Sequence, residues 1–299
     1  MNKNIQIGVL YYLKENSYIH SKSLLPIQLG FSETGVDMGI QKDNTGDNRS
    51  ERHPIYSEYS GIYWMWKNVS ADYKGVFQHR RSLAGRENTP LHIQWDFLTI
   101  QAKVRFLSLI KNSRALWNPI IKISNHQKYV EEVLRSVNYI SDVIDKGFDI
   151  VVPAPYHFVG FSVYEHFDEV VNRGLMVILK RVLENNYTQY FGLFKDSLND
   201  SKMYYANISV MRNELFDEYC KFVFGVFDEL EQVLINERYY INLYKERSMY
   251  RVFGYIGELL TNVFIRKKKK DGCKIKELWL LYDSSVKGNE STDYNKIKL

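Results

Sequence analysis

A polar, cationic group follows a short apolar segment in the first third of the chain. Gln78, His79, Arg80 and Arg81 come directly after Tyr73–Phe77 (YKGVF), which has the β-prone composition of a buried strand. In open α/β sheets, ligands bind outside the carboxyl ends of the strands. Two guanidinium groups at a strand end therefore favour an anionic ligand, most simply a phosphate or diphosphate. The same residues also fit a solvated charge cluster on an ordinary helix–turn–strand unit.

The segment before this strand combines a polar loop with a compact helix. The loop Asp43–Asn48 (DNTGDN) consists of residues that favour turns, so we expect it at a surface or a cleft. Ser57 is the predicted N-cap of the helix, and Glu58 suits its first turn. One apolar stripe with helical spacing follows, formed by Tyr59, Ile62, Tyr63 and Trp66.

A second predicted helix, Arg251–Phe264, carries three chemically different side chains on one stripe. Arg251, Tyr255 and Glu258 are spaced i, i+4 and i+7, beside a buried apolar stripe. They either reach into a cleft together or form a surface ion pair worth only a few tenths of a kcal/mol. Asn207 is a further candidate, a polar residue within the β-prone segment Tyr204–Met211. The alternative for Asn207 is an outward-facing strand residue.

The composition is ordinary for a globular protein and weakly basic. The 299 residues suffice for one large α/β domain or two small ones. A net charge of +5 fits anionic partners such as nucleotide diphosphates or an anionic membrane surface, and is too small to indicate nucleic acid. The two cysteines lie in no metal or redox motif and fit a reducing cytosol. We find no signal-peptide pattern and no run of about 18 apolar residues, which predicts a cytoplasmic protein.

Alternating apolar segments predict an α/β fold. Ile5–Tyr12 is the first buried strand, and Leu24–Gly30 is a second, confined to an edge by Pro26. The amphipathic helix Tyr129–Lys146, ended by Gly147, leads at once into the buried strand Phe148–Val152. This alternation implies a largely parallel sheet. We predict one domain over residues 1–265, with a helical insert at about 87–146, and a basic C-terminal extension over 266–299.

The segments described above resemble the signature of one bacterial family. Its members are capsular and exopolysaccharide glycosyltransferases that were first catalogued as a domain of unknown function. The family pattern is a DNTGDNIS loop, a C-E-L-T-x-x-Y-W-x-W-K-N helix and a G-L-x-H-Y-R-R strand end. Here Ser57 and Tyr59 replace the usual Cys and Leu, and Gln78-His79 replaces His-Tyr. The segments Tyr204–Cys220 and Arg251–Leu260 continue the resemblance in the right order.

The resemblance implies a GT-A-like fold, a Rossmann-type mixed sheet flanked by helices, and a hexosyltransferase activity. Such an enzyme moves a sugar, with galactofuranose or galactose favoured, from a UDP-sugar to a glycan or lipid-linked acceptor in capsule, O-antigen or exopolysaccharide synthesis. It must stabilise the leaving diphosphate and, for inversion, deprotonate the acceptor hydroxyl. No D-x-D motif ends the Tyr73–Phe77 strand, so the arginines are predicted to replace Mn²⁺ or Mg²⁺ partly or wholly. No metal ligand is assigned.

The resemblance also assigns roles to residues. Glu258 is the first candidate for the catalytic base and Asp43 the second. Asn44, Asp47 and Asn48 are expected to contact the ribose or the base of the nucleotide. The other predicted nucleotide-sugar contacts are Glu58, Gln78, His79, Arg80, Arg81, Asn207 and Arg251. Tyr156 and His157 follow a strand end and are candidates for sugar contact or ordinary loop residues. The stereochemical outcome, inverting or retaining, stays open.

Two other interpretations fit the sequence. A non-catalytic protein that binds a nucleotide sugar or a glycan on the same fold would explain the missing D-x-D motif. The run Arg266–Lys270 (RKKKK) is either a solvated face or a contact for the anionic inner face of the membrane, where each basic residue contributes about 1 kcal/mol. Since aromatic residues do not interleave the basic run, a nucleic-acid partner is not predicted.

Overall fold

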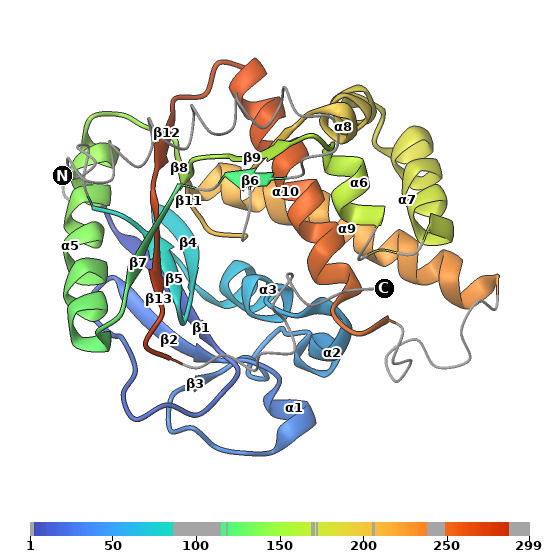
Figure 1. Cartoon of the computed structure of the whole chain (residues 1–299). Coiled ribbons are helices and arrows are strands. Elements are labelled where there is room, and N and C mark those ends of the chain that lie inside the picture. The colour runs from blue at the N-terminus through green and yellow to red at the C-terminus, as the bar shows by residue number, and fades with distance from the viewer. Residues whose placement is uncertain are drawn as a thin grey trace.

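The fold is built around a mixed sheet with helices on both faces (Figure 1). The computed structural model describes residues 3–85, 115–117, 119–168, 171, 173–204, 207–237 and 249–286. Within this part of the chain the strands form one sheet of ten strands and one of three.

Four of the six strand pairings along the main path of the large sheet are parallel. Its strand order is β12 (Ile275–Leu278), β8 (Ile150–Pro153), β11 (Ser209–Arg212), β4 (Tyr73–Gln78), β1 (Ile5–Tyr11), β2 (Leu24–Gln28) and β3 (Gln41–Lys42). β1 pairs in parallel with β2 and β4, β2 with β3, and β8 with β12, whereas β11 is antiparallel to both of its neighbours. The largely parallel sheet predicted from the α/β alternation is confirmed. The edge position predicted for Leu24–Gly30 from Pro26 is wrong, because β2 lies between β1 and β3. The two-residue β3 pairs with Ile27 and Gln28, which follow Pro26, so the missing N–H of the proline interrupts no pairing with β3.

Three further strands extend the sheet from the carboxyl end of β4. Gln78 pairs with Arg81, so β4 and β5 (Arg81–Leu83) form a hairpin whose turn is His79–Arg80. β13 (Leu280–Asp283) is antiparallel to β5 and parallel to β7 (Ile120–Ile123). The small antiparallel sheet comprises β10 (Lys202–Met203), β9 (Tyr156–Val159) and β6 (Ala115–Trp117).

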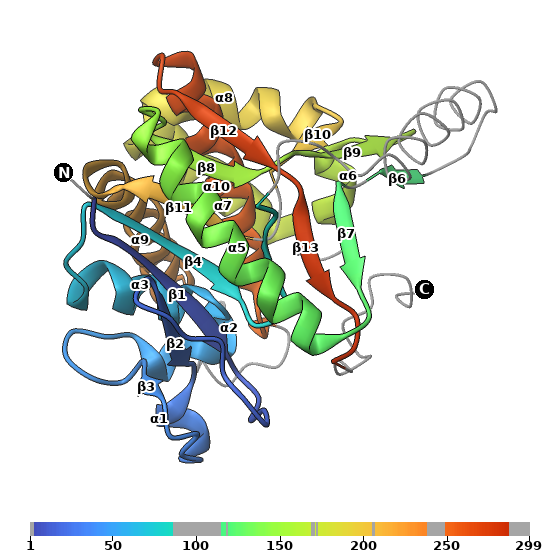
Figure 2. The ribbon, with the colours of Figure 1, turned by 90° about the vertical axis from the view of Figure 1, so that its left-hand side faces the viewer.

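Side-chain alternation along the strands divides the core into two layers. Ile5, Ile7 and Val9 of β1 pack in the layer that contains α5 (His126–Asp145), while Leu10 faces the opposite layer. That second layer holds α3 (Tyr59–Asn68), α9 (Asn213–Asn236) and α10 (Val252–Lys270). Figure 2 shows α5 lying across its face of the sheet. The remaining helices are α1 (Phe31–Thr34), η1 (Ser50–Arg52), α2 (His53–Tyr56), α6 (Val163–Asp168), α7 (Arg173–Asn186) and α8 (Thr188–Asn199).

The structure corrects the predicted domain division. The boundary at residue 265 falls inside α10, and β12 and β13 complete the large sheet rather than forming an extension. The predicted helix Tyr129–Lys146 is confirmed as α5, with Gly147 at φ +84° after it. Because α5 packs against β5, β7 and β13, it belongs to the main body and not to an insert. Residues 87–114 of the predicted insert lie outside the described part of the chain.

The basic run Arg266–Lys270 forms the last turns of α10, where cations are favourable near the helix C-terminus. Arg266 pairs with Asp200 at 2.7 Å, and the buried Lys268 pairs with Glu218 at 2.6 Å. Lys267 and Lys269 pair with Asp271 and Glu277. These contacts place the run in the folded body and not in a tail. Among the described helices, none is both long and apolar enough to traverse a bilayer.

Candidate active site

Two carboxyl groups from different helices, the buried Glu258 and the half-buried Glu58, interact electrostatically beside the carboxyl end of β4. Glu58 is the N-cap residue of α3, and Glu258 lies two turns into α10. Arg251 is the N-cap residue of α10, and its guanidinium Nη2 lies 3.4 Å from Glu58 Oε1. The backbone N–H of Arg251 donates to the Pro54 carbonyl, which ties the start of α10 to α2. The helix starts therefore bring together two acids that are 200 positions apart in sequence.

The environment gives the two carboxyl groups different proton affinities. Burial and the nearby charge of Glu58 raise the pKa of Glu258 to about 8, with Arg81 and Arg251 opposing that shift. Burial also acts to raise the pKa of Glu58, but the Arg251 charge and the Ser57 hydroxyl outweigh it and leave this pKa below its ordinary value. Ser57 Oγ donates to Glu58 Oε2 at 2.5 Å. Glu58 is thus the ionised partner, and Glu258 exchanges a proton near neutral pH.

The β4–β5 hairpin supplies the cation that faces this pair. The Arg81 charge acts on both Glu258 and the buried Tyr156 hydroxyl, and Arg81 Nη1 donates to Gln78 Oε1 at 2.9 Å. Burial, together with Arg80 and Arg81, lowers the pKa of His79 to about 3, so this imidazole is neutral. The structure thereby brings Gln78, His79, Arg81, Arg251, Glu58 and Glu258 to one region.

Arg80 points away from the carboxyl pair. Its Nη1 donates to the Val286 carbonyl at 2.9 Å, and its guanidinium carbon lies 5.5 Å from the Tyr282 ring centroid. Arg81 lies over the same ring at 5.4 Å. The two arginines therefore both lie against Tyr282, and Arg81 is the one whose charge acts on Glu258. Arg80 Nε is buried without a hydrogen-bond partner among the described residues.

Asn207 is placed by a buried hydroxyl network that the sequence did not reveal. It lies in a turn before β11, at φ +51°, and not within a strand as predicted. Its Oδ1 accepts from the Tyr59 hydroxyl at 2.7 Å. Tyr59 also contacts Thr261 Oγ1 at 2.9 Å and the Tyr219 hydroxyl at 3.2 Å. Thr261 in turn donates to the Gly257 carbonyl, so the network locks α3 against α10 beside the two acids.

Sequence reasoning treated Tyr59 as one more apolar residue of a helical stripe. The signal that was available is chemical: a tyrosine buried in a stripe requires a partner for its hydroxyl. The partners Thr261 and Tyr219 lie on helices distant in sequence, and only the fold identifies them. Ser57 likewise is not the N-cap that was predicted. It ends α2 at φ +53°, and Glu58 takes the N-cap position.

Close packing of α10 on Tyr59 gives a test of this arrangement. A Cβ added at Gly257 would lie 2.2 Å from two Tyr59 ring carbons. Gly257→Ala is therefore expected to lower the free energy of unfolding by about 1–3 kcal/mol, measured by urea denaturation. The matched control is Gly192→Ala in α8, where a Cβ meets nothing within 4 Å. That variant should be neutral or more stable, by up to about 1 kcal/mol. Equal destabilisation of both variants would contradict the packing.

Asp43 has a structural role in the fold. Its side chain is fully buried and accepts hydrogen bonds from the Gly30 N–H at 3.0 Å and the Ser60 hydroxyl at 2.8 Å. It also accepts from the Ser50 hydroxyl at 2.5 Å and the Phe31 N–H at 3.4 Å. Because four donors occupy this carboxylate, we do not retain Asp43 as a candidate base.

The rest of the polar loop lies along α3, toward the end of the helix opposite Glu58. The Tyr63 hydroxyl donates to Asp47 Oδ1, and Asn68 Nδ2 donates to the Asp47 carbonyl. Asn48 Nδ2 donates to the Asn44 and Gly46 carbonyls within the loop. These contacts tie Asp47 to α3 and Asn48 to the loop itself, and none of them joins Asn44, Asp47 or Asn48 to the carboxyl pair.

The acids of the candidate site do not form a metal-binding set. Among the described residues, no three His, Cys, Asp or Glu side chains gather closely enough to hold a metal ion. Glu58 and Glu258 have Arg251 and Arg81 as their charged neighbours instead. The position after β4, where a D-x-D motif was absent from the sequence, holds the neutral His79 and the two arginines.

Comparison with known proteins identifies the family. The chain matches the model described as "Domain of unknown function (DUF4422)" over residues 8–270. A search of curated proteins gave no match. Among solved structures, the apo form of WbbM, a bifunctional glycosyltransferase, is similar, with a TM-score of 0.75 and 26% identity. The match covers 94% of this chain and only 45% of that chain. It confirms the predicted mixed sheet flanked by helices, and the protein is a member of the DUF4422 family.

Proposed function

We propose that this protein is a glycosyltransferase that moves a hexose from a UDP-sugar to a hydroxyl of a glycan or lipid-linked acceptor. The observation that carries the proposal is the pairing of an ionised Glu58 with a protonatable Glu258 beside Arg81 and Arg251. The likeness to a bifunctional glycosyltransferase supports the same reaction class. Galactofuranose and galactose are the favoured donor sugars, and surface polysaccharide assembly is the favoured process.

Each charged group of the candidate site has one role in the proposed reaction. The acceptor O–H proton passes to the Glu258 carboxylate as the acceptor oxygen bonds to the anomeric carbon. The bond from that carbon to the diphosphate oxygen breaks, and its electron pair leaves with UDP. Arg81 and Arg251 offset the charge that develops on the diphosphate, since guanidinium groups match phosphate oxygens in geometry and charge. Glu58 holds Arg251 in place at 3.4 Å.

A ligand panel tests the donor class. UDP-galactofuranose, UDP-galactose, UDP-glucose and GDP-mannose are compared by thermal shift, each with EDTA or with Mn²⁺. A UDP-sugar at 100 times its Kd should add about 2.7 kcal/mol of stability. We expect stabilisation by UDP-sugars with EDTA present, because arginines occupy the D-x-D position. If only Mn²⁺ permits stabilisation, the metal-free assignment fails. If UDP-sugars never stabilise the protein, the proposed function fails.

Arg81 is expected to dominate donor binding among the hairpin residues. Arg81→Gln removes a cation that acts on Glu258 and should raise the donor KM at least tenfold, about 1.4 kcal/mol. The pKa of Glu258 should also rise, because Arg81 now lowers it. The matched control is Arg135→Gln on α5, whose side chain is 62% exposed and pairs with Glu132. An unchanged donor KM in the Arg81 variant would remove this arginine from the diphosphate site.

A further inference from the structure

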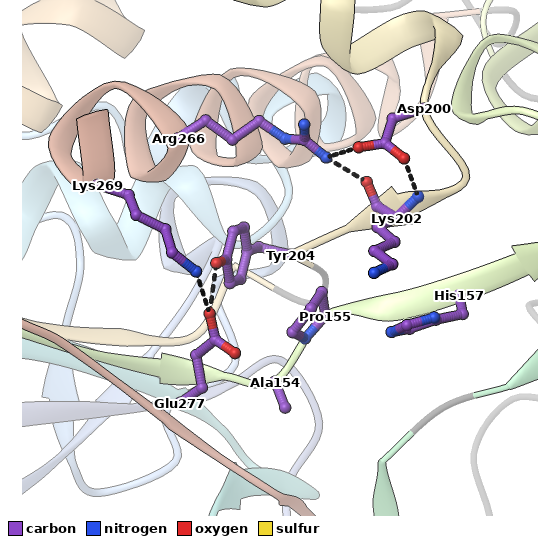
Figure 3. Close-up of a pocket in the computed structure, with 9 residues that line it drawn as sticks. All are labelled: Ala154, Pro155, His157, Asp200, Lys202, Tyr204, Arg266, Lys269 and Glu277. Atoms are coloured by element: carbon purple, nitrogen blue, oxygen red, sulfur yellow. Dashed lines mark hydrogen bonds and ion pairs between the residues drawn. The ribbon is translucent and has the colours of Figure 1, made fainter.

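A polar pocket lies on the side of β9 to which His157 projects. Tyr156 and His157 are consecutive strand residues, so their side chains project to opposite sides. The Tyr156 hydroxyl lies within electrostatic reach of Arg81 and Glu258. His157 instead lines a pocket of about 460 Å³ with Lys202 and Tyr204 (Figure 3). Strand β9 thus separates the pocket from the candidate active site.

Two ion pairs form most of the polar lining. Arg266 Nη2 donates to Asp200 Oδ2 at 2.7 Å and to the Lys202 carbonyl at 2.7 Å. Glu277 Oε1 accepts from the Tyr204 hydroxyl at 2.6 Å and from Lys269 Nζ at 3.2 Å. Figure 3 shows these pairs on two sides of the pocket. The Lys202 ammonium is joined to none of the other residues drawn there.

We infer that this pocket binds a hydroxyl-rich sugar unit of the acceptor glycan, distant from the unit that reacts. This inference rests on the proposed function. Sugar hydroxyls both donate and accept, and each ion pair here offers donors beside an acceptor carboxylate. The half-buried ring of His157 supplies an amphipathic face of the kind that packs on a sugar ring, and the Tyr204 hydroxyl orients the Glu277 carboxylate as an acceptor.

The charges of the pocket argue against a nucleotide diphosphate as its occupant. Asp200 and Glu277 lie among its cations, and each would repel a phosphate. The cations Arg266 and Lys269 are already paired with these carboxylates. A neutral glycan faces no such repulsion. The candidate active site differs because its Arg81 and Arg251 lie beside only one ionised carboxylate, that of Glu58, since Glu258 is mostly protonated at neutral pH.

Helix α10 connects the pocket with the reacting centre. Glu258 and Arg266 are eight residues apart on α10, which corresponds to about 12 Å along the helix axis. A glycan of several units that passes around the end of β9 would span this distance, with its terminal hydroxyl at Glu258 and an inner unit in the pocket. The pocket would strengthen the binding of long acceptors and would change the binding of monosaccharides little.

The test uses glycan binding rather than turnover. The wild-type chain and the double variant His157→Ala/Lys202→Ala are applied to an array of bacterial surface oligosaccharides from one to six units. Both side chains are partly or fully exposed, so the variant should fold, as verified by thermal melting. We expect wild-type binding to at least one oligosaccharide of three or more units and at least tenfold weaker binding by the variant. Lys180→Ala, an exposed lysine of α7, is the matched control.

Three results would overturn the assignment. They are absence of wild-type binding to any oligosaccharide, equal binding by the double variant, and competition for the pocket by UDP. Stabilisation by UDP-sugars is measured separately, in both proteins. If UDP-sugars stabilise both proteins equally while the array fails, the pocket assignment fails and the proposed function stands. If the array succeeds without stabilisation by UDP-sugars, the protein binds glycans and the transferase proposal fails.

Discussion

Glu258→Gln is expected to lower kcat by about 10²–10⁴, the range that a positioned general base contributes. The amide keeps the shape of the side chain but cannot take the acceptor proton. With a pKa of about 8, Glu258 is mostly protonated at neutral pH, so wild-type kcat/KM should rise with pH up to about 8. The pH–rate profile of UDP release with acceptor present measures both effects. Near-normal turnover by the variant would exclude Glu258 as the base.

A stability measurement separates lost chemistry from lost structure. The pKa of Glu258 rises from 4.5 to about 8 on folding, so its protonated form is the one that the fold favours. That contribution is fully present below pH 4.5 and is lost as the pH rises through 8. Glu258→Gln carries no such dependence. Its stability relative to wild type should therefore increase by on the order of 4 kcal/mol between pH 4.5 and pH 8. If the Glu258→Gln variant were less stable than wild type at pH 8, its loss of activity would not identify a catalytic base. That result would also contradict the claim that burial raises the pKa of Glu258.

Asp43→Ala is expected to cost about 3–5 kcal/mol of folding stability. The substitution leaves two backbone N–H groups and two hydroxyls, those of Ser50 and Ser60, without their acceptor in a buried site. A loss of this size is a large share of the stability of a typical domain. Urea denaturation monitored by tryptophan fluorescence measures it. Activity should fall only in proportion to the unfolded fraction, because Asp43 does not touch the carboxyl pair.

The matched control is a second aspartate of the same loop. Asp47 is exposed and accepts one side-chain hydrogen bond, from the Tyr63 hydroxyl at 3.1 Å. Asp47→Ala should therefore cost less than about 1 kcal/mol. If Asp47→Ala instead raised the donor KM strongly without a loss of stability, the loop would contact the nucleotide after all. The structural role assigned to the loop would then be wrong.

Local sequence patterns predicted most of the individual elements. Hydrophobic spacing identified β1, α5 and β8, because each buries a stripe or a face that repeats with the period of its own backbone. The same reasoning misplaced the C-terminal boundary. Five consecutive cations at 266–270 are typical of a solvated tail, and two of their carboxylate partners, Asp200 and Glu218, are distant in sequence.

The sequence by itself determined the α/β alternation, the cationic group after β4 and the presence of Glu58 and Glu258 on helices. Each of these follows from residues that are neighbours along the chain. The tertiary structure alone decided that the two acids meet and that Arg81 faces them while Arg80 turns toward Val286. It also decided that Asp43 is a buried carboxylate that accepts four hydrogen bonds. These outcomes depend on the burial of polar groups and on contacts between charges that are about 200 positions apart in sequence. A local sequence pattern contains neither kind of information.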